Sequence, residues 1–239
     1  MRRPSREAGP ERVRRAYASY GRSQRRRRAW AADNRGNIAA RAELLSACWE
    51  LVGAQLADGA EVLDAGCGTG FWLRSLVERG VSPGRLHGIE LLPERLAASR
   101  DALPAAVQLR QGDVRKLPYD DASFDVVLLF TVLSSLGGPQ DVGMALREAG
   151  RVMRPDATLL IYEPRYPNPL NRHTARIPVG LVREALGPVE ERPVTVWPPV
   201  ARRLGRFTEP VYRRLAGRRW ATSHRLLAYR NRLPKLSLG

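Results

Sequence analysis

Three acidic residues, each at the end of a run that reads as a strand, are the residues of this chain best placed to bind a polar ligand. Asp64 leads into a glycine-rich loop, where its carboxylate suits a ligand that carries positive charge. Glu90 ends the next run about 20 residues beyond that loop, the usual place for a carboxylate that chelates two ribose hydroxyls. Asp113 ends a third run and can accept from an exocyclic amine such as that of adenine. Each acid alone is more often a solvated strand end, but together they predict a nucleoside-like ligand.

The loop after Asp64 has glycine at every second position, Gly66, Gly68 and Gly70, and a segment with helical spacing follows it. Glycine lets the backbone take positive φ and lets a ligand lie against the main chain. A strand, a glycine loop and a helix build a nucleotide-sized pocket at the strand's carboxyl end. A dinucleotide fingerprint would need a third glycine at position 71, which is Phe71. The alternatives are therefore a nucleoside site that is not a dinucleotide site, or a plain strand-to-helix turn.

The elements that must position these residues alternate between strand and helix, which predicts an α/β fold with a doubly wound, mostly parallel sheet. Helical spacing predicts helices over residues 11–20, 37–56, 71–80, from Pro93, 140–152 and 179–186. The segments between them read as strands over residues 62–65, 85–90, 107–114, 126–133, from 158, 194–197 and 223–230.

Four stretches over about residues 41–164 resemble the class I S-adenosylmethionine-dependent methyltransferases of the small-molecule type: VLDAGCGTG, GIELLPERL, QGDVRKLPYDDASFDVVLLFTVLSSL and REAGRVMRPDATLLIYEP. The resemblance implies a Rossmann-like, seven-stranded sheet whose last strand is antiparallel. One departure is the stretch 153–157, Met-Arg-Pro-Asp-Ala, where the family usually has Leu-Arg-Pro-Gly-Gly. We expect this stretch to form a turn before the fifth strand, away from the cofactor.

The resemblance also implies the cofactor, S-adenosyl-L-methionine, with S-adenosyl-L-homocysteine as its product. Asp64, Gly66 and Gly68 would hold the methionine end, and Glu90 the ribose. Asp113 and Val114 would bind adenine, with Phe130 and Thr131 beside the sulfonium. The full set of residues expected at the cofactor is Tyr17, Tyr20, Asp64, Ala65, Gly66, Gly68, Glu90, Leu91, Asp113, Val114, Phe130 and Thr131.

Catalytic candidates are fewer, because an amine or thiolate acceptor needs little beyond correct placement, whereas a hydroxyl acceptor benefits from a general base. His173 follows the fifth strand in a proline-rich loop, and Tyr162 and Glu163 end that strand. Tyr17 and Tyr20 lie on the first helix, which we expect to close over the cofactor as a lid. No metal site is expected.

The net charge of +16 belongs to the two ends of the 239-residue chain. Residues 1–36 carry +9 and residues 200–239 carry +10, which leaves −3 for the part between them. Basic ends suit nucleic acid or anionic lipid. The alternative is compositional, because 38 of the 40 basic residues are arginine, as a GC-rich genome would encode. We expect a basic segment over residues 1–36 with the lid helix, and a methyltransferase domain over 37–239.

Before the last strand, residues 200–219 place apolar side chains on one helical face and arginines on the others, and Pro210 is expected to split them into two helices. This basic helical insertion could lie on a membrane, cover the substrate or pack on the domain. The stretches YEPRYPNPLN and WPPVARRL also resemble a bacterial methyltransferase group found beside glycan and natural-product genes.

These observations predict O- or N-methylation of a small or amphiphilic acceptor: a natural-product, glycan or lipid intermediate. A nucleic-acid methyltransferase is the alternative, although no Asn/Asp-Pro-Pro-Tyr motif or Pro-Cys nucleophile is present. A non-catalytic cofactor-binding protein is a further one. No apolar run is long enough to span a membrane. The two cysteines, Cys48 and Cys67, have no zinc or disulfide spacing, so we expect a cytoplasmic protein. The acceptor and the oligomeric state stay open.

Overall fold

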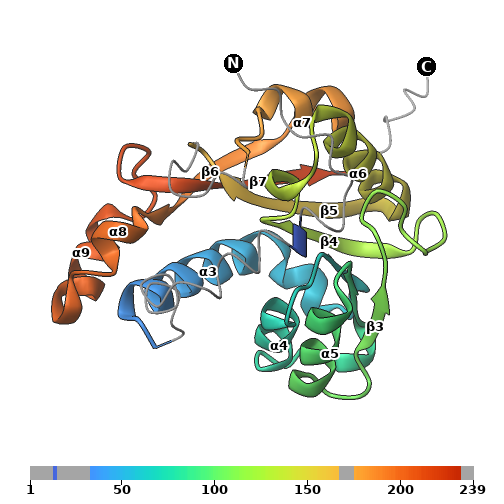
Figure 1. Ribbon diagram of the computed structural model, residues 1–239, viewed down its shortest axis with the longest axis horizontal. Coiled ribbons are helices and arrows are strands. Elements are labelled where there is room, and N and C mark those ends of the chain that lie inside the picture. The colour runs from blue at the N-terminus through green and yellow to red at the C-terminus, as the bar shows by residue number, and fades with distance from the viewer. Residues whose placement is uncertain (1–12, 15–32, 167–174, 233–239) are drawn as a thin grey trace.

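The computed structural model describes residues 13–14, 33–166 and 175–232, and its centre is a seven-stranded sheet in the order β3-β2-β1-β4-β5-β7-β6 (Figure 1). β7 pairs antiparallel with both β5 and β6, and the other pairings are parallel. The predicted Rossmann-like, doubly wound sheet with an antiparallel last strand is therefore confirmed. The strands are β1 (Val62–Ala65), β2 (Leu86–Glu90), β3 (Gln108–Gln111), β4 (Phe124–Phe130), β5 (Met153–Pro164), β6 (Glu190–Val196) and β7 (Thr222–Arg230).

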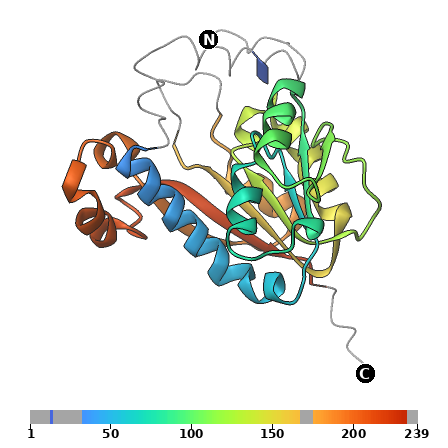
Figure 2. The ribbon, with the colours of Figure 1, turned by 90° about the horizontal axis from the view of Figure 1, so that it is seen from below.

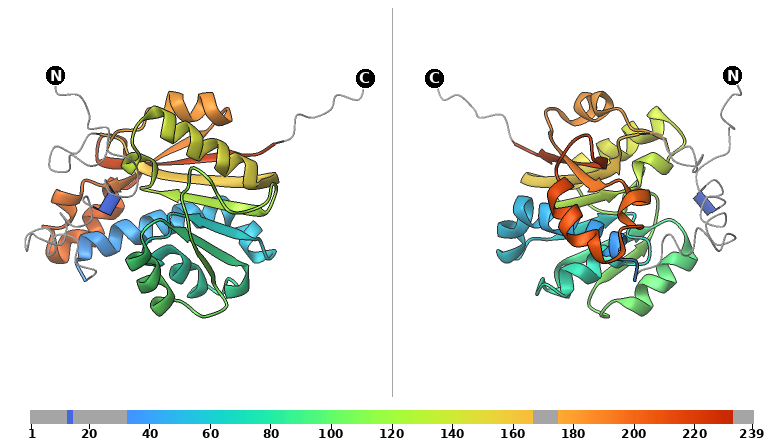
Figure 3. Two further views of the ribbon diagram at one scale, coloured as in Figure 1. Left: turned by 45° about the vertical axis from the view of Figure 1, so that its right-hand side comes forward. Right: turned by 90° about the vertical axis from the view of Figure 1, so that its left-hand side faces the viewer.

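Helices cover both faces of the sheet (Figure 3). The central strands carry apolar residues at successive positions, so apolar side chains point to both faces and each face is packed against helices. One face carries α3 (Arg35–Ala57), α4 (Phe71–Val77) and α5 (Pro93–Ala102), and the other carries α6 (Pro139–Val152) and α7 (Val179–Leu186). Short 3₁₀ turns, η1 (Pro83–Arg85) and η2 (Leu133–Ser135), complete the connections. Topology alone places the carboxyl ends of β1, β2, β4 and β5 at one edge of the sheet.

The long helix α3 begins where Asn34 caps it, since the Asn34 side chain accepts from the backbone N–H groups of Gly36 and Asn37. Its buried residues recur at helical spacing and pack on the sheet: Leu44, Leu45, Cys48, Val52 and Leu56. Ile38, in the first turn of the helix, is half exposed. Since α3 begins at Arg35, it crosses the expected boundary between residues 36 and 37, and the division into domains stays a prediction.

The insertion between β6 and β7 forms α8 (Pro198–Ala201), η3 (Gly205–Phe207) and α9 (Thr208–Leu215), which pack against the N-terminal half of α3 (Figure 2). The expected break at Pro210 is wrong. Pro210 lies in the first turn of α9, where a missing N–H costs nothing, and the chain breaks earlier, around Gly205 with φ of 51°. The expected continuous apolar face is also wrong, because Val200 and Phe207 are exposed whereas Tyr212 is buried.

Two boundaries differ from the sequence expectation. Residues 153–157 do not form a turn ahead of the fifth strand, because β5 already begins at Met153. Asp156 takes a left-handed conformation there, and the β4–β5 register shifts between Phe124 and Val126, so the irregularity sits inside the paired strands. β4 ends at Phe130, earlier than expected, which places Thr131 in the connection that follows it. In the described part of the chain, no helix is long and apolar enough to cross a membrane.

Candidate functional site

The glycine loop between β1 and α4 has the geometry that the sequence predicted. Gly66, Gly68 and Gly70 all take positive φ, at 102°, 61° and 78°. A Cβ on Gly66 would collide with the Val132 side chain, and a Cβ on Gly68 with the Arg95 guanidinium. The backbone N–H of Gly66 also donates to the carbonyl of Ile89 at 2.8 Å, which ties the loop to β2. The positive φ and the close neighbours together explain why glycine occupies these positions.

Glu90, at the end of β2, braces this loop. Its Oε2 accepts from the backbone N–H of Gly68 at 2.9 Å, and its Oε1 accepts from that of Leu92 at 2.9 Å. The Arg95 guanidinium lies 3.6 Å from Oε2, and the Glu90 side chain is buried. Each carboxylate oxygen has lone pairs left for a further donor, so Glu90 can position the loop and bind hydroxyls together.

Asp64, at the end of β1, is buried, and its Oδ2 has no hydrogen-bond partner among the described residues. Burial, and then the charge of Glu90, raise the pKa of Asp64 to about 7. A buried carboxylate oxygen without a partner is costly, and a ligand that brings N–H donors or positive charge removes the cost. The site therefore fits a group such as the ammonium end of an amino acid. Burial also raises the pKa of the Cys67 thiol, so that side chain is an unreactive part of the loop.

Asp113 lies just after β3, and its carboxylate is already engaged. Arg115 donates to it through Nε and Nη2, the latter at 2.6 Å, and the backbone N–H of Arg115 donates to Oδ1 at 2.9 Å. Burial would raise the pKa of Asp113, but these bonds and the Arg115 charge lower it. The same guanidinium reaches Asp141 at 2.9 Å, which fixes the connection to α6. The expected contact with adenine stays a prediction, and Val114 beside it is buried.

Phe130 and Thr131 mark the carboxyl end of β4. The Phe130 ring meets Trp72 edge-on, with centroids 5.0 Å apart, and Tyr162 with centroids 6.0 Å apart. Thr131 takes φ of 59°, a strained conformation for a β-branched residue, and its N–H donates to the carbonyl of Tyr162 at 2.8 Å. Such strain is typical of residues whose placement is set by their surroundings.

Tyr162 and Glu163 are neighbours at the end of β5, so their side chains point to opposite faces of the sheet. The hydroxyl of Tyr162 lies 2.8 Å from Oγ1 of Thr195, and its ring stacks on His224 with centroids 4.8 Å apart. Burial raises the pKa of Tyr162, and burial followed by the charge of Arg202 lowers that of His224 to about 4. The structure does not bring Tyr162 and Glu163 together as one catalytic group.

Glu163 faces the connection after β4 instead. It is buried, and its Oε1 accepts from the backbone N–H of Ser134 at 3.3 Å. Its Oε2 has no partner in the described part of the chain. Burial raises the pKa of Glu163 to about 7 against the opposing effect of hydrogen bonds from Ser134, Leu133 and Val132. Its contacts are those of a group that positions the loop after β4. Tyr17, Tyr20 and His173 lie outside the described residues.

A polar network between α3, β6 and α9 was not predicted from the sequence. Oε2 of Glu43 accepts from the Tyr212 hydroxyl at 2.7 Å and from the backbone N–H of Thr195 at 2.7 Å. Thr195 takes φ of 65°, which interrupts the β6–β7 ladder and turns its N–H toward α3. No local motif marks these residues, because the network joins positions more than 150 residues apart.

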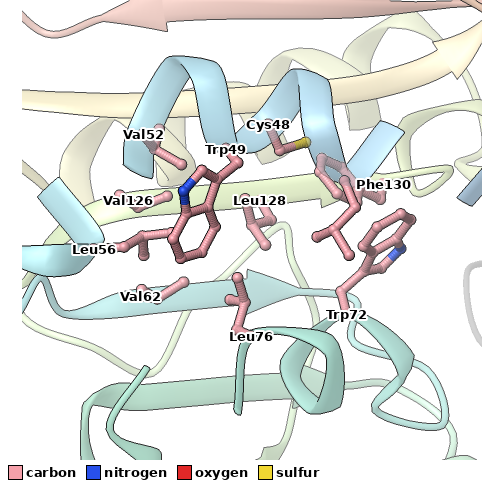
Figure 4. Close-up of a pocket in the computed structure, with 11 residues that line it drawn as sticks. Cys48, Trp49, Val52, Leu56, Val62, Trp72, Leu76, Val126, Leu128 and Phe130 are labelled. Carbon is pink, nitrogen blue, oxygen red and sulfur yellow. The ribbon is translucent and has the colours of Figure 1, made fainter. Parts of the chain in front are cut away.

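An apolar pocket lies behind the site, between α3, α4 and the sheet, with Trp49, Trp72 and Phe130 in its walls (Figure 4). Its free volume is about 20 Å³, room for about one water molecule, and its walls offer no polar partner. It is a packing gap, too small for an acceptor. Among the described residues, no group of three or more His, Cys, Asp or Glu is arranged to hold a metal ion.

Comparisons with known proteins agree with this geometry. Residues 63–161 match a family model described as a methyltransferase domain. A demethylmenaquinone methyltransferase of Lactiplantibacillus plantarum is 33% identical over 118 residues, 47% of this chain and 48% of the relative. The chain thus aligns with about half the length of that curated relative.

Two solved structures show the fold. A 1,6-didemethyltoxoflavin-N1-methyltransferase of Burkholderia thailandensis, solved with 1,6-didemethyltoxoflavin and S-adenosylhomocysteine, has a TM-score of 0.61 at 20% identity. The match covers 96% of this chain and 93% of that one. The PH0226 protein of Pyrococcus horikoshii OT3 has a TM-score of 0.59 at 17% identity, covering 94% of this chain and 100% of the other.

Proposed function

We propose that this chain, whose residues 63–161 match the methyltransferase-domain model, is a class I S-adenosylmethionine-dependent methyltransferase that methylates a small or amphiphilic acceptor on oxygen or nitrogen. The cofactor is S-adenosyl-L-methionine. The observation that carries the proposal is the arrangement of the glycine loop, buried Asp64 and buried Glu90 at the ends of adjacent strands. A plain strand-to-helix turn needs no buried carboxylate with an unpartnered oxygen.

Each part of this arrangement has a role in holding the cofactor. Asp64 and the main chain of Ala65, Gly66 and Gly68 would hold its methionine end, since the Asp64 carboxylate lacks a donor that an ammonium group supplies. Glu90 and Leu91 would bind the ribose. Asp113 and Val114 would lie at the adenine, and Phe130 and Thr131 at the sulfonium.

When bound, S-adenosylmethionine supplies an electrophilic methyl group on a positively charged sulfur. The task of the chain is to align an acceptor atom with that group, keep water out and accept a proton where the acceptor carries one. The ring contacts among Phe130, Trp72 and Tyr162 give an apolar wall on the α3 side. Glu163 acts from the opposite face, by holding the backbone at Ser134.

A hydroxyl acceptor benefits from a general base that takes its proton. His173 follows β5 in the sequence, so it is the histidine we propose for this step. Replacing His173 with alanine should lower turnover about 10²-fold while cofactor affinity is kept. Unchanged turnover would remove His173 from the mechanism and leave Tyr162 and Glu163 to be tested in the same way.

Calorimetry tests cofactor binding directly. We expect S-adenosylhomocysteine to bind in the low micromolar range, about −8 kcal/mol, and NAD not to bind. NAD binding in place of S-adenosylhomocysteine would refute the assignment.

The acceptor can be found with labelled S-adenosylmethionine against lipid extract, glycan and natural-product intermediates, and RNA. Demethylmenaquinone, named in the curated relative, belongs in that panel. Nucleic acid is the second candidate, favoured by the charge of the chain ends. Methylation of RNA with no label in the lipid or small-molecule fractions would favour it over the proposal.

A further inference from the structure

Three exposed aromatic residues, Tyr166, Trp197 and Trp220, lie close together and form the centre of an exposed surface. The rings of Tyr166 and Trp197 stack with centroids 5.4 Å apart and an interplanar angle of 22°. The indole N–H of Trp197 donates to the backbone carbonyl of Trp220 at 3.3 Å. Trp220 is nevertheless 70% exposed. These contacts join three separate segments of the chain through two stacked rings and one bond to the Trp220 backbone, so the three exposed aromatic residues lie close together.

Further exposed apolar residues lie in the same region. Val200 follows Trp197 by one helical turn, Phe207 belongs to the same insertion, and Ile38 lies in the first turn of α3, which packs on α8. Of eight large apolar residues exposed in the described part of the chain, six belong to this region: Ile38, Tyr166, Trp197, Val200, Phe207 and Trp220. A concentration of this kind marks an interaction surface.

The surface is strongly basic, which indicates the kind of partner that can bind it. Residues 197–220 contain seven arginines and one acid, Glu209, which pairs with Arg213 at 3.1 Å. A second copy of the chain in a symmetric contact would bring the same positive charge against it. The sequence of residues 15–32 has the same sign of charge, with six arginines and no acid. The partner must therefore be anionic and must accept apolar side chains.

The surface belongs to the same edge of the sheet as the glycine loop. Tyr166 follows the end of β5, Trp197 follows the end of β6, and Trp220 precedes the antiparallel strand β7. Figures 1 and 3 show that α8 and α9 project from the body of the protein at this end. A partner on this surface would face the edge at which the cofactor and acceptor are proposed to meet.

We propose that this surface docks on membranes that contain anionic phospholipid. Tryptophan and arginine are suited to the headgroup region, where rings reach the acyl boundary and guanidinium groups pair with phosphates. RNA would also suit arginines and aromatic rings. However, the aliphatic side chains of Val200 and Ile38 gain nothing from base stacking and do gain from leaving water at an acyl boundary.

Docking in this orientation defines the acceptor class, a conclusion that rests on the proposed function. The acceptor would be an amphiphile that resides in the membrane, with its reactive end at the headgroup level. It would reach the carboxyl edge of the sheet without crossing bulk water. The docking itself requires neither cofactor nor turnover, so the two proposals can fail separately.

Co-sedimentation of the full chain with vesicles tests the surface. We expect at least about tenfold tighter binding to vesicles of phosphatidylglycerol and phosphatidylcholine than to phosphatidylcholine alone. Trp220→Ala should weaken that binding about fivefold or more, and Arg218→Glu with Arg219→Glu should weaken it further. Met144→Ala and Arg147→Glu change an exposed apolar and an exposed basic residue on α6, and both should bind as the parent does.

The same preparations are checked for thermal unfolding and S-adenosylhomocysteine binding, which Trp220→Ala should leave unchanged. Equal binding to neutral and anionic vesicles would overturn the proposal, as would equal losses in the α6 variants. Binding to a short single-stranded RNA that depends on Trp220, with no vesicle binding, would replace it with a nucleic-acid surface. Vesicle binding without S-adenosylhomocysteine binding would refute the proposed function and keep the docking surface.

Discussion

At the amino edge of the parallel strands, Glu61 and Asp125 have partners for their carboxylates, whereas at the carboxyl edge Asp64 and Glu163 each keep an oxygen without a partner among the described residues. Glu61 accepts from Arg85 and lies 3.0 Å from Nε2 of His87. Asp125 accepts from Arg154 and from the backbone N–H of Glu61.

The pKa values of Glu61, Asp64 and Glu163 follow the same division. Asp113 at the carboxyl edge differs, because burial would raise its pKa but its bonds to Arg115 outweigh burial and lower it. Burial would raise the pKa of Glu61, but hydrogen bonds from Arg85 and His87 lower it. At the other edge, burial raises the pKa values of Asp64 and Glu163 to about 7. Acids of the first kind stabilise the fold, whereas acids of the second kind destabilise it when charged and are retained for another purpose. The edge whose unpaired acids cost stability is the edge at which we propose that the cofactor binds.

The largest expected effect is on stability against pH. A folded-state pKa near 7, above the unfolded value near 4, means that Asp64 and Glu163 destabilise the fold fully above pH 7 and not below pH 4. Asp64→Asn or Glu163→Gln should therefore raise the unfolding free energy of the cofactor-free protein at pH 8 by about 2–4 kcal/mol. Chemical denaturation at pH 8 and pH 5.5 checks this, because the gain should shrink at the lower pH. An equal gain at both pH values would contradict the unpaired-charge interpretation.

Removing an acid at the carboxyl edge should weaken cofactor binding, whereas removing one at the amino edge should not. Asp64→Ala and Glu90→Ala should each weaken S-adenosylhomocysteine binding by about 1–3 kcal/mol, because hydrogen bonds to charged groups are lost. Glu61→Ala is the matched control, since it removes a half-buried carboxylate just before β1 and away from the glycine loop. Calorimetry should find the control as tight as the parent, and a comparable loss in all three would remove the distinction between the edges.

Glu61→Ala should instead reduce stability. It leaves His87 and Arg85 without their carboxylate, and Nδ1 of His87 already has no partner among the described residues. We expect a loss of about 1–2 kcal/mol in the unfolding free energy at pH 7. Glu61→Gln should recover part of the loss by keeping one acceptor. If both variants unfold like the parent, the amino-edge pairs contribute nothing measurable, as exposed ion pairs often do.

The sequence was sufficient for the glycine loop and for the placement of Glu90 because both depend on short-range patterns: an apolar run, a turn and a fixed spacing. The sequence also contained the information that Tyr162 and Glu163 face opposite sides of the sheet, since neighbours in a strand point to opposite faces. Arg95 against Glu90 and Glu43 against Tyr212 could not be predicted, because tertiary packing alone brings these pairs together. The position of the break near Gly205 was missed because proline is tolerated in a first helical turn.

The smallest expected effect concerns two residues with strained backbone conformations, one at the amino edge of the parallel strands and one at the carboxyl edge. Ala122 takes φ of 52° in the turn before β4, at the amino edge, and Thr131 takes φ of 59° after β4, at the carboxyl edge. Glycine removes the left-handed strain at both, so Ala122→Gly and Thr131→Gly should each change stability by no more than about 1 kcal/mol. Their effects on binding should differ. Ala122→Gly should leave S-adenosylhomocysteine affinity unchanged, whereas Thr131→Gly should lower it. Glycine keeps the N–H that donates to the Tyr162 carbonyl, but it gives the backbone at the proposed sulfonium position more conformational freedom, which binding must then restrict. Calorimetry on the pair decides whether strain at the carboxyl edge serves the site, and equal affinities would make Thr131 a turn residue like Ala122.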